Sequence, residues 1–311
     1  MAVSVTRRWP AWTPAALPLG AVLLSIGATG VTRVGAVIAM GCYGLYAWAF
    51  WLAWRCPGAA RWVLRAVGAG VIVAVYAQAI VTHARPWNPN IMATLLLLTV
   101  PFGYQAGLSW WLAGLYALGF TGARAAWVAV PLAVFILLNW PQGRARLRGL
   151  RLVGVGLLLV GLTGALIAIR PGTVLGVRLP EYIGAARAYW ARPTGSGPWS
   201  HRVDSLPLTV AAELGFPGLV AWAGLSVSVI HRALHTQGNP ARLACLLWLS
   251  HQLADYTLWD IPSTMLAAAA LALLFKPEVT DETGSATSAG ITPPVGGVGF
   301  VSDPARDGGA V

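Results

Sequence analysis

Residues 34–54 read VGAVIAMGCYGLYAWAFWLAW and contain no charged side chain. A helix needs about 20 apolar residues to cross the hydrocarbon core of a membrane, so this stretch is long enough for one crossing. The same criterion, applied outward from it, predicts about ten spans. They cover residues 15–32, 34–54, 64–82, 90–104, 107–122, 125–140, 152–169, 212–230, 243–258 and 261–275. Only the polar pair Tyr104 and Gln105 marks the boundary between the fourth and the fifth, so a re-entrant hairpin is the alternative for these two.

The composition also indicates a membrane protein. Of 311 residues, 57% are hydrophobic and 10% are charged, whereas roughly a quarter of the residues in a soluble domain are charged. The 16 Trp residues agree with this class, because Trp is favoured at membrane interfaces. The three Cys residues lie in or beside apolar runs without metal-ligand spacing, which predicts neither a disulfide nor a metal site.

The basic residues predict the orientation of the chain. A net charge of +11 would suggest a nucleic-acid partner in a soluble protein. Here the basic residues lie mainly in short gaps between apolar runs, so we expect no nucleic-acid partner. Basic loops remain in the cytoplasm. Ten spans with the N-terminus inside place four Arg-rich segments there: Arg7–Arg8, the Arg55/Arg61/Arg65 loop, the Arg144/Arg146/Arg148/Arg151 loop and the Arg232–Arg242 loop.

The outer side then receives a specific polar set. It includes the one large loop, residues 170–211, and all five acidic residues that precede the tail: Glu181, Asp204, Glu213, Asp255 and Asp260. Arg residues left outside, against the usual bias, suggest an anionic ligand. The predicted organisation is a cytoplasmic N-terminus at 1–14, a transmembrane domain at 15–275 and a disordered cytoplasmic tail at 276–311, which is rich in Gly, Pro, Ser and Thr.

Three local patterns lie on this outer side. Residues 85–90 read Arg-Pro-Trp-Asn-Pro-Asn, residues 121–124 read Thr-Gly-Ala-Arg, and residues 212–218 read Ala-Glu-Leu-Gly-Phe-Pro-Gly. Together they resemble the O-antigen ligase and Wzy-type polysaccharide polymerase superfamily, which has an Asn-Pro-Asn element, a Thr-Gly-Ser-Arg-like junction and an Ala-Glu-x-Gly-x-x-Gly segment. Residues 193–198, Pro-Thr-Gly-Ser-Gly-Pro, resemble its Pro-x-x-Gly-x-Gly turn. Residues 254–256 and 261–262 resemble its last periplasmic turn.

The resemblance covers residues 80–275 and implies a function. The fold would be an all-α, polytopic membrane protein with a GT-C-like glycosyltransferase architecture, in the bacterial inner membrane with its active face in the periplasm. It would transfer a glycan from undecaprenyl diphosphate to a hydroxyl of lipid A core, of a growing polysaccharide or of a protein, without a metal or another cofactor. Arg suits a diphosphate leaving group because its planar fork matches phosphate oxygens. The attacking hydroxyl needs a proton acceptor, and His is suited to that role near neutral pH.

The resemblance implies site residues as well. Arg124 would act on the leaving group. Nine residues before Glu213, where the family has His, this chain has Asp204, and His201 lies three residues earlier. We favour His201 as the proton acceptor, with Asp204 or an inactive scaffold relative as the alternatives. Candidate substrate-binding residues are Arg85, Asn88, Asn90, Arg178, Arg187, Arg202 and Glu213.

Simpler roles compete with these. Arg124 can extend to the membrane interface, Asn88 and Asn90 can begin a helix, and Asp204 can cap span eight. The amphipathic stretch 181–190 can rest on the membrane surface, where its Arg residues would bind lipid headgroups, and Glu213 can pair with an Arg. A transporter or flippase for an anionic lipid-linked glycan is the alternative from another class. Transporters place broken or polar segments near the membrane midplane, in matched halves, so the one-sided polar set and the absence of a repeat favour the enzyme.

Overall fold

The computed structural model describes residues 33–82, 88–139, 178–198, 200, 203–236, 238–253, 255 and 260–276. Every regular element in these ranges is a helix. The elements are α2 (Arg33–Arg55), α3 (Pro57–Thr82), α4 (Pro89–Thr99), the 3₁₀ helix η1 (Val100–Ala106), α5 (Leu108–Thr121), α6 (Arg124–Asn139), α9 (Leu179–Ala191), α10 (Leu206–His235), α11 (Pro240–Gln252) and α12 (Ile261–Phe275). Predictions for spans 15–32 and 152–169, for Arg85, His201 and Arg202, and for the tail lie outside the described residues.

Helix is confirmed at each predicted span within the described ranges, although α11 ends at Gln252, ahead of the predicted residue 258. The stretch 181–190 is helical and lies within α9. Among the described residues, three segments are long and apolar enough to cross a membrane: Val37–Arg55, Pro57–Val81 and Leu206–His235. Pro89–Gly103 and Ile261–Phe275 are apolar but shorter. The fold is therefore all-helical, with three candidate membrane spans.

Proline and short polar side chains set where the helices begin. Pro occupies the first turn of α4, α9, α10, α11 and α12, where its missing N–H has no helical partner in any case. Side-chain oxygens of Asn88, Asn239 and Asp260 accept hydrogen bonds from the first turns of α4, α11 and α12. α10 begins at Leu206, ahead of the predicted residue 212, because Pro207 is tolerated in its first turn.

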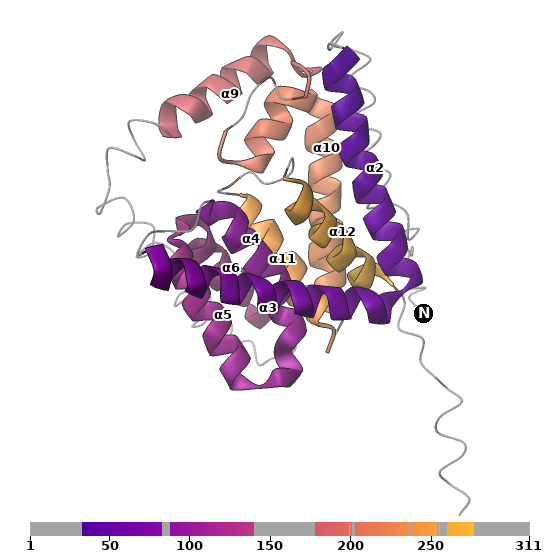
Figure 1. The fold of residues 1–311 in the computed structure, drawn as a ribbon. Coiled ribbons are helices and arrows are strands. Elements are labelled where there is room, and N and C mark those ends of the chain that lie inside the picture. Colours follow the sequence, from indigo (N-terminus) through magenta and orange to yellow (C-terminus); the bar gives the residue numbers. More distant parts are fainter. Residues whose placement is uncertain are drawn as a thin grey trace, which may run out of the picture. The chain divides into compact units, whose positions relative to one another are not determined.

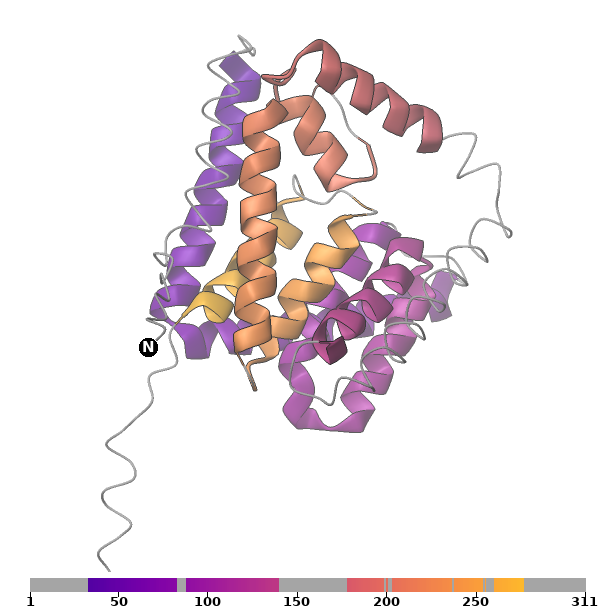
Figure 2. The ribbon, with the colours of Figure 1, turned by 180° about the vertical axis from the view of Figure 1, so that it is seen from behind.

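One apolar core joins most of the helices. α2 packs along α12, whereas α3 packs on α4, η1 and α5. Figure 1 shows α3 running across the lower end of α2 rather than beside it. α11 contacts α4, η1, α6, α10 and α12 and is thus central to the core. α9 lies beside the first half of α10 in both views (Figures 1 and 2), with a small apolar cluster of Ala185, Val203 and Ala212.

The two ends of α10, α11 and α12 differ in chemistry. At one end, Arg232 Nε donates to the Leu274 carbonyl at 3.1 Å, and Asn239 Nδ2 donates to the Leu273 carbonyl at 3.0 Å. Lys276 Nζ donates to the Trp54 carbonyl at 2.8 Å, which ties the end of α12 to the end of α2. Asp255 follows the opposite end of α11, and Asp260 precedes α12. These helices therefore carry their basic and acidic groups at opposite ends.

Asp260 offers a first test of the helix starts. Its Oδ2 accepts from Ser263 N at 3.0 Å, so we expect Asp260→Ala to lower the free energy of unfolding by about 1 kcal/mol. Asp260→Asn keeps a capping oxygen and should lose less than half of that. Denaturant titration in detergent micelles measures both. Equal losses would mean that the capping hydrogen bond is not what Asp260 contributes.

Candidate functional site

α10 contains a sharp break in its first half. Gly215 has φ 65° and ψ −155° inside the helix, a conformation essentially restricted to glycine. Two residues later comes Pro217, which has no N–H to donate. The carbonyls of Ala212 and Glu213 thereby lose their usual partners four residues on.

The turn at Pro193–Gly197 supplies the missing hydrogen bonds. Ser196 N donates to the Ala212 carbonyl at 2.9 Å, and Gly197 N donates to the Glu213 carbonyl at 2.9 Å. In return, Phe216 N donates to the Pro193 carbonyl at 2.7 Å. The turn and the break approach so closely that a Cβ on Gly195 would lie 2.4 Å from the Glu213 carbonyl oxygen. Two of the segments that carry the family resemblance, 193–198 and 212–218, are thus bonded to each other.

Arg178 and Asp204 form the charged part of the loop. Arg178 precedes α9, and its guanidinium forms an ion pair with the carboxylate of Asp204, just before α10. Both side chains are about one-third exposed, at 33% and 34%. From α9, the Tyr182 hydroxyl donates to the Asp204 carbonyl at 3.1 Å. Ser205 immediately precedes α10 and makes no side-chain capping bond. Asp204 is engaged with Arg178, so the ion pair rather than a cap fixes this segment.

The two Asn residues of the Asn-Pro-Asn element have separate roles. Asn88 caps α4, because its Oδ1 accepts from Ile91 N at 3.2 Å. Asn90 bonds to a residue far along the chain, because its Nδ2 donates to Asp255 Oδ1 at 3.2 Å. The helix-start role is therefore confirmed for Asn88, and Asn90 connects the start of α4 to the residues that follow α11.

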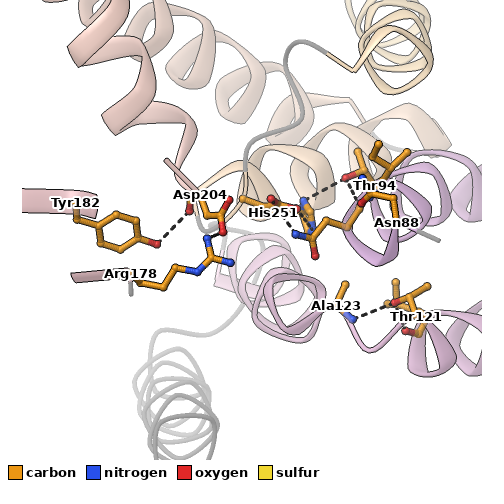
Figure 3. Close-up of polar contacts among 12 residues, drawn as sticks. Asn88, Thr94, Thr121, Ala123, Arg178, Tyr182, Asp204 and His251 are labelled. Carbon is orange, nitrogen blue, oxygen red and sulfur yellow. Dashed lines mark hydrogen bonds and ion pairs between the residues drawn. The ribbon is translucent and has the colours of Figure 1, made fainter. Parts of the chain in front are cut away.

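A buried polar cluster surrounds this connection (Figure 3). His251 is fully buried on α11, and its Nδ1 lies 3.3 Å from Thr94 Oγ1 of α4. His251 Nε2 lies 3.6 Å from Asp255 Oδ2, four residues later. Asp255 is only 3% exposed, and the neighbouring Gln252 is fully buried. Sequence patterns singled out Asn90 and Asp255 but missed His251 and Thr94. The signal was available, since an ionisable side chain inside an apolar run indicates a functional site by default.

Electrostatics links the buried cluster to the charged loop. Burial raises the pKa of the Tyr182 phenol. The guanidinium of Arg178 opposes this increase, and the negative charges of Glu181 and Asp255 add to it. Asp255 therefore lies near enough to influence the side chain that contacts Asp204. Loop and cluster belong to one polar region.

The remaining candidates are spread around this region. The Thr-Gly-Ala-Arg junction is a tight turn, in which Gly122 ends α5 with φ 66° and Ala123 N donates to Thr121 Oγ1 at 3.2 Å. Arg124 is the first residue of α6, and its side chain lies outside the described part of the chain. Glu213 is 1% exposed, immediately before the α10 break. Arg187 is exposed on α9. Among the described residues, no group of three or more His, Cys, Asp or Glu could hold a metal ion.

Comparison of the chain with protein-family models and with curated proteins gives no match.

Proposed function

We propose that this chain is a glycosyltransferase of the bacterial inner membrane, spanning it about ten times with both termini in the cytoplasm. It moves a glycan from undecaprenyl diphosphate to an acceptor hydroxyl on the periplasmic face. The acceptor is lipid A core, a growing polysaccharide or a protein. The three apolar helices and the opposite ends of α10–α12 support the membrane and orientation parts of this proposal.

The hydrogen bond from Asn90 to Asp255 carries the functional part. These residues are 165 positions apart and belong to the first and last segments of the family resemblance. The turn at 193–197 and the break of α10 form a second such pair. Patterns that are each weak alone thus meet in space, as segments of one site would. The exposed position of Arg187 is also compatible with lipid headgroups, which α9 would contact on the membrane surface.

The proposed chemistry assigns roles to the charged residues singled out by the sequence. The acceptor oxygen attacks the anomeric carbon, the bond from that carbon to the diphosphate oxygen breaks, and undecaprenyl diphosphate leaves with the electron pair. Arg124, together with Arg85 and Arg202, neutralises the charge that develops on the diphosphate. His201 and Asp204 are the loop's candidates for accepting the proton.

Reconstitution tests the proposal. The purified protein is placed in vesicles with a glycan on undecaprenyl diphosphate, and lipid A core, an oligosaccharide and an acceptor protein are offered separately. Mass spectrometry should detect a glycosylated product and released undecaprenyl diphosphate with one of them. Arg124→Ala should lower the rate at least about 100-fold, because removing a stabiliser of developing charge typically costs that much. Arg61→Ala, an exposed Arg in the first turns of α3, should keep the rate.

Other results would contradict this function. Movement of the lipid-linked glycan across the vesicle membrane without product would favour the transporter or flippase alternative. Donor binding without transfer or movement would favour an inactive scaffold. A rate that survives the paired substitution His201→Ala/Asp204→Ala would leave the transferase function in place and put the proton acceptor outside the loop.

A further inference from the structure

The environment of His251 determines which nitrogen carries its hydrogen. Thr94 Oγ1 donates its single hydrogen to the Asn90 carbonyl at 2.9 Å, so towards His251 Nδ1 it can only accept. Nδ1 is accordingly assigned the hydrogen, and Nε2 keeps its lone pair. Figure 3 shows the imidazole and the Thr94 side chain directed towards each other.

The lone pair of Nε2 is directed towards a carboxylate. Nε2 is buried without a hydrogen-bond partner, and the 3.6 Å to Asp255 Oδ2 exceeds the usual N–H···O range. One proton placed between these two atoms would bind both of them. In a buried site such a hydrogen bond is stronger than in water. The pair therefore has the geometry of a site for one proton.

We propose that His251 and Asp255 together accept the proton that leaves the acceptor hydroxyl. This inference rests on the proposed transferase function and specifies its base. As the new bond to the anomeric carbon forms, the hydroxyl proton passes to the Asp255 carboxylate and is shared with His251 Nε2, and the diphosphate leaves as the anion. Asp255 is the catalytic residue of the two, and His251 is a positioning residue that acts through it.

Two further contacts support this assignment over Asp204. The Asp204 carboxylate already pairs with the Arg178 guanidinium, which stabilises its charged form and makes it a weaker proton acceptor. Asp255 accepts a hydrogen bond from the neutral amide of Asn90. Its charge also acts on Tyr182, within the polar region where the donor is expected.

The elements packed on α11 bring few other ionisable groups. α4 and α12 contain none. The others are Tyr104 of η1, Arg124 of α6, and Glu213, His231, Arg232 and His235 of α10. His231, Arg232 and His235 lie in the last two turns of α10, and Glu213 lies in its first half.

A pH profile of transfer tests the pair. A proton already bound to the pair blocks uptake of the next one, so wild-type transfer should fall as the pH falls. His251→Gln removes the lone pair that helps to hold that proton, so Asp255 binds it more weakly. We expect the maximal rate to drop about 100-fold, with KM for the donor unchanged and the acidic limb of the profile moved to lower pH. A purely structural role for His251 would change the yield of folded protein and leave the limb in place.

One variant serves as the control. Ser263→Ala removes a buried hydroxyl of α12 that makes no hydrogen bond, so it should leave both the rate and the profile unchanged. If wild-type protein is active and His251→Gln has an unchanged pH profile, the role of His251 and Asp255 is overturned and the transferase function stands. Absence of transfer by wild-type protein overturns the transferase function and the role of the pair with it.

A second measurement does not depend on activity. In ¹⁵N-histidine-labelled protein reconstituted in lipid nanodiscs, the signal absent from His251→Gln identifies His251. It should show the Nδ1–H form in the neutral state, and Asp255→Asn should alter its titration. An Nε2–H form, or a titration that is the same in Asp255→Asn, contradicts the pair.

Discussion

Gly215→Ala should lower the free energy of unfolding by at least about 3 kcal/mol, the largest effect we expect from a single methyl group in this chain. The backbone of Gly215 has a positive φ that an alanine adopts only with strain. Its added Cβ would also lie 2.3 Å from the Pro193 carbonyl oxygen and 2.5 Å from Gly195 N. Both atoms are backbone, so no side-chain movement can relieve the clash. Denaturant titration in micelles measures the loss.

Gly184→Ala provides the matched control. Gly184 lies within α9, and a Cβ added there would have no other atom within 4 Å. Alanine should be neutral or slightly stabilising at this position, because it favours helix by up to about 1 kcal/mol over glycine. Similar stabilities for the two variants would mean that the turn at 193–197 and the α10 break do not meet as described.

Asn90→Asp should lower the free energy of unfolding strongly, whereas Asn88→Asp, the same substitution two residues away, should leave it nearly unchanged. At position 90 the change replaces an amide donor with a second carboxylate beside Asp255, whose Oδ1 lies 3.2 Å from Asn90 Nδ2. A lost hydrogen bond and a like-charge pair, in which Asp255 is buried and position 90 is half-buried, should together cost about 3 kcal/mol or more. Transfer activity should fall as well, because Asp255 is held by this contact.

At position 88 the same change keeps the cap. Asp is as good as Asn at a helix start, and its charge suits the N-terminus of a helix. We expect Asn88→Asp to stay within about 0.5 kcal/mol of wild type. The loss in Asn90→Asp should also shrink as the pH falls, because a proton on one carboxyl relieves the repulsion. Equal losses in the two variants, or a pH-independent loss at position 90, would contradict the separate roles of the two Asn residues.

The helices could be predicted because their causes are local. Apolar runs, Pro in the first turn and short polar caps mark where helices begin, and α12 begins and ends at the predicted residues, 261 and 275. The break of α10 was less accessible. Gly215 and Pro217 were visible, but the helix continues past them only because donors from residues 196 and 197 replace the missing bonds. That compensation is a tertiary contact, and a local pattern does not contain it.

The site was predictable only in part, because local motifs are visible in the sequence and tertiary contacts are not. Asn90 was singled out by its motif, but its partner Asp255 lies 165 residues away and became evident only in the fold. His251 lies in an apolar run, so hydropathy placed it in a span, and its contacts with Thr94 and Asp255 became evident only in the fold. Arg178 was expected to bind substrate, and its ion pair with Asp204 shows how a loop can use a charge to hold its own shape.

The hydrogen bonds between the α10 break and the turn at 193–197 limit how the loop before α10 can change in length. Pro217 has no N–H to donate to the Glu213 carbonyl, so the donors at 196 and 197 must stay in register with residues 212 and 213. An inserted or deleted residue between 193 and 197 would shift both donors at once. Insertions and deletions in this loop should therefore occur on either side of this five-residue stretch. The length of the stretch itself is fixed by its hydrogen bonds to the broken helix.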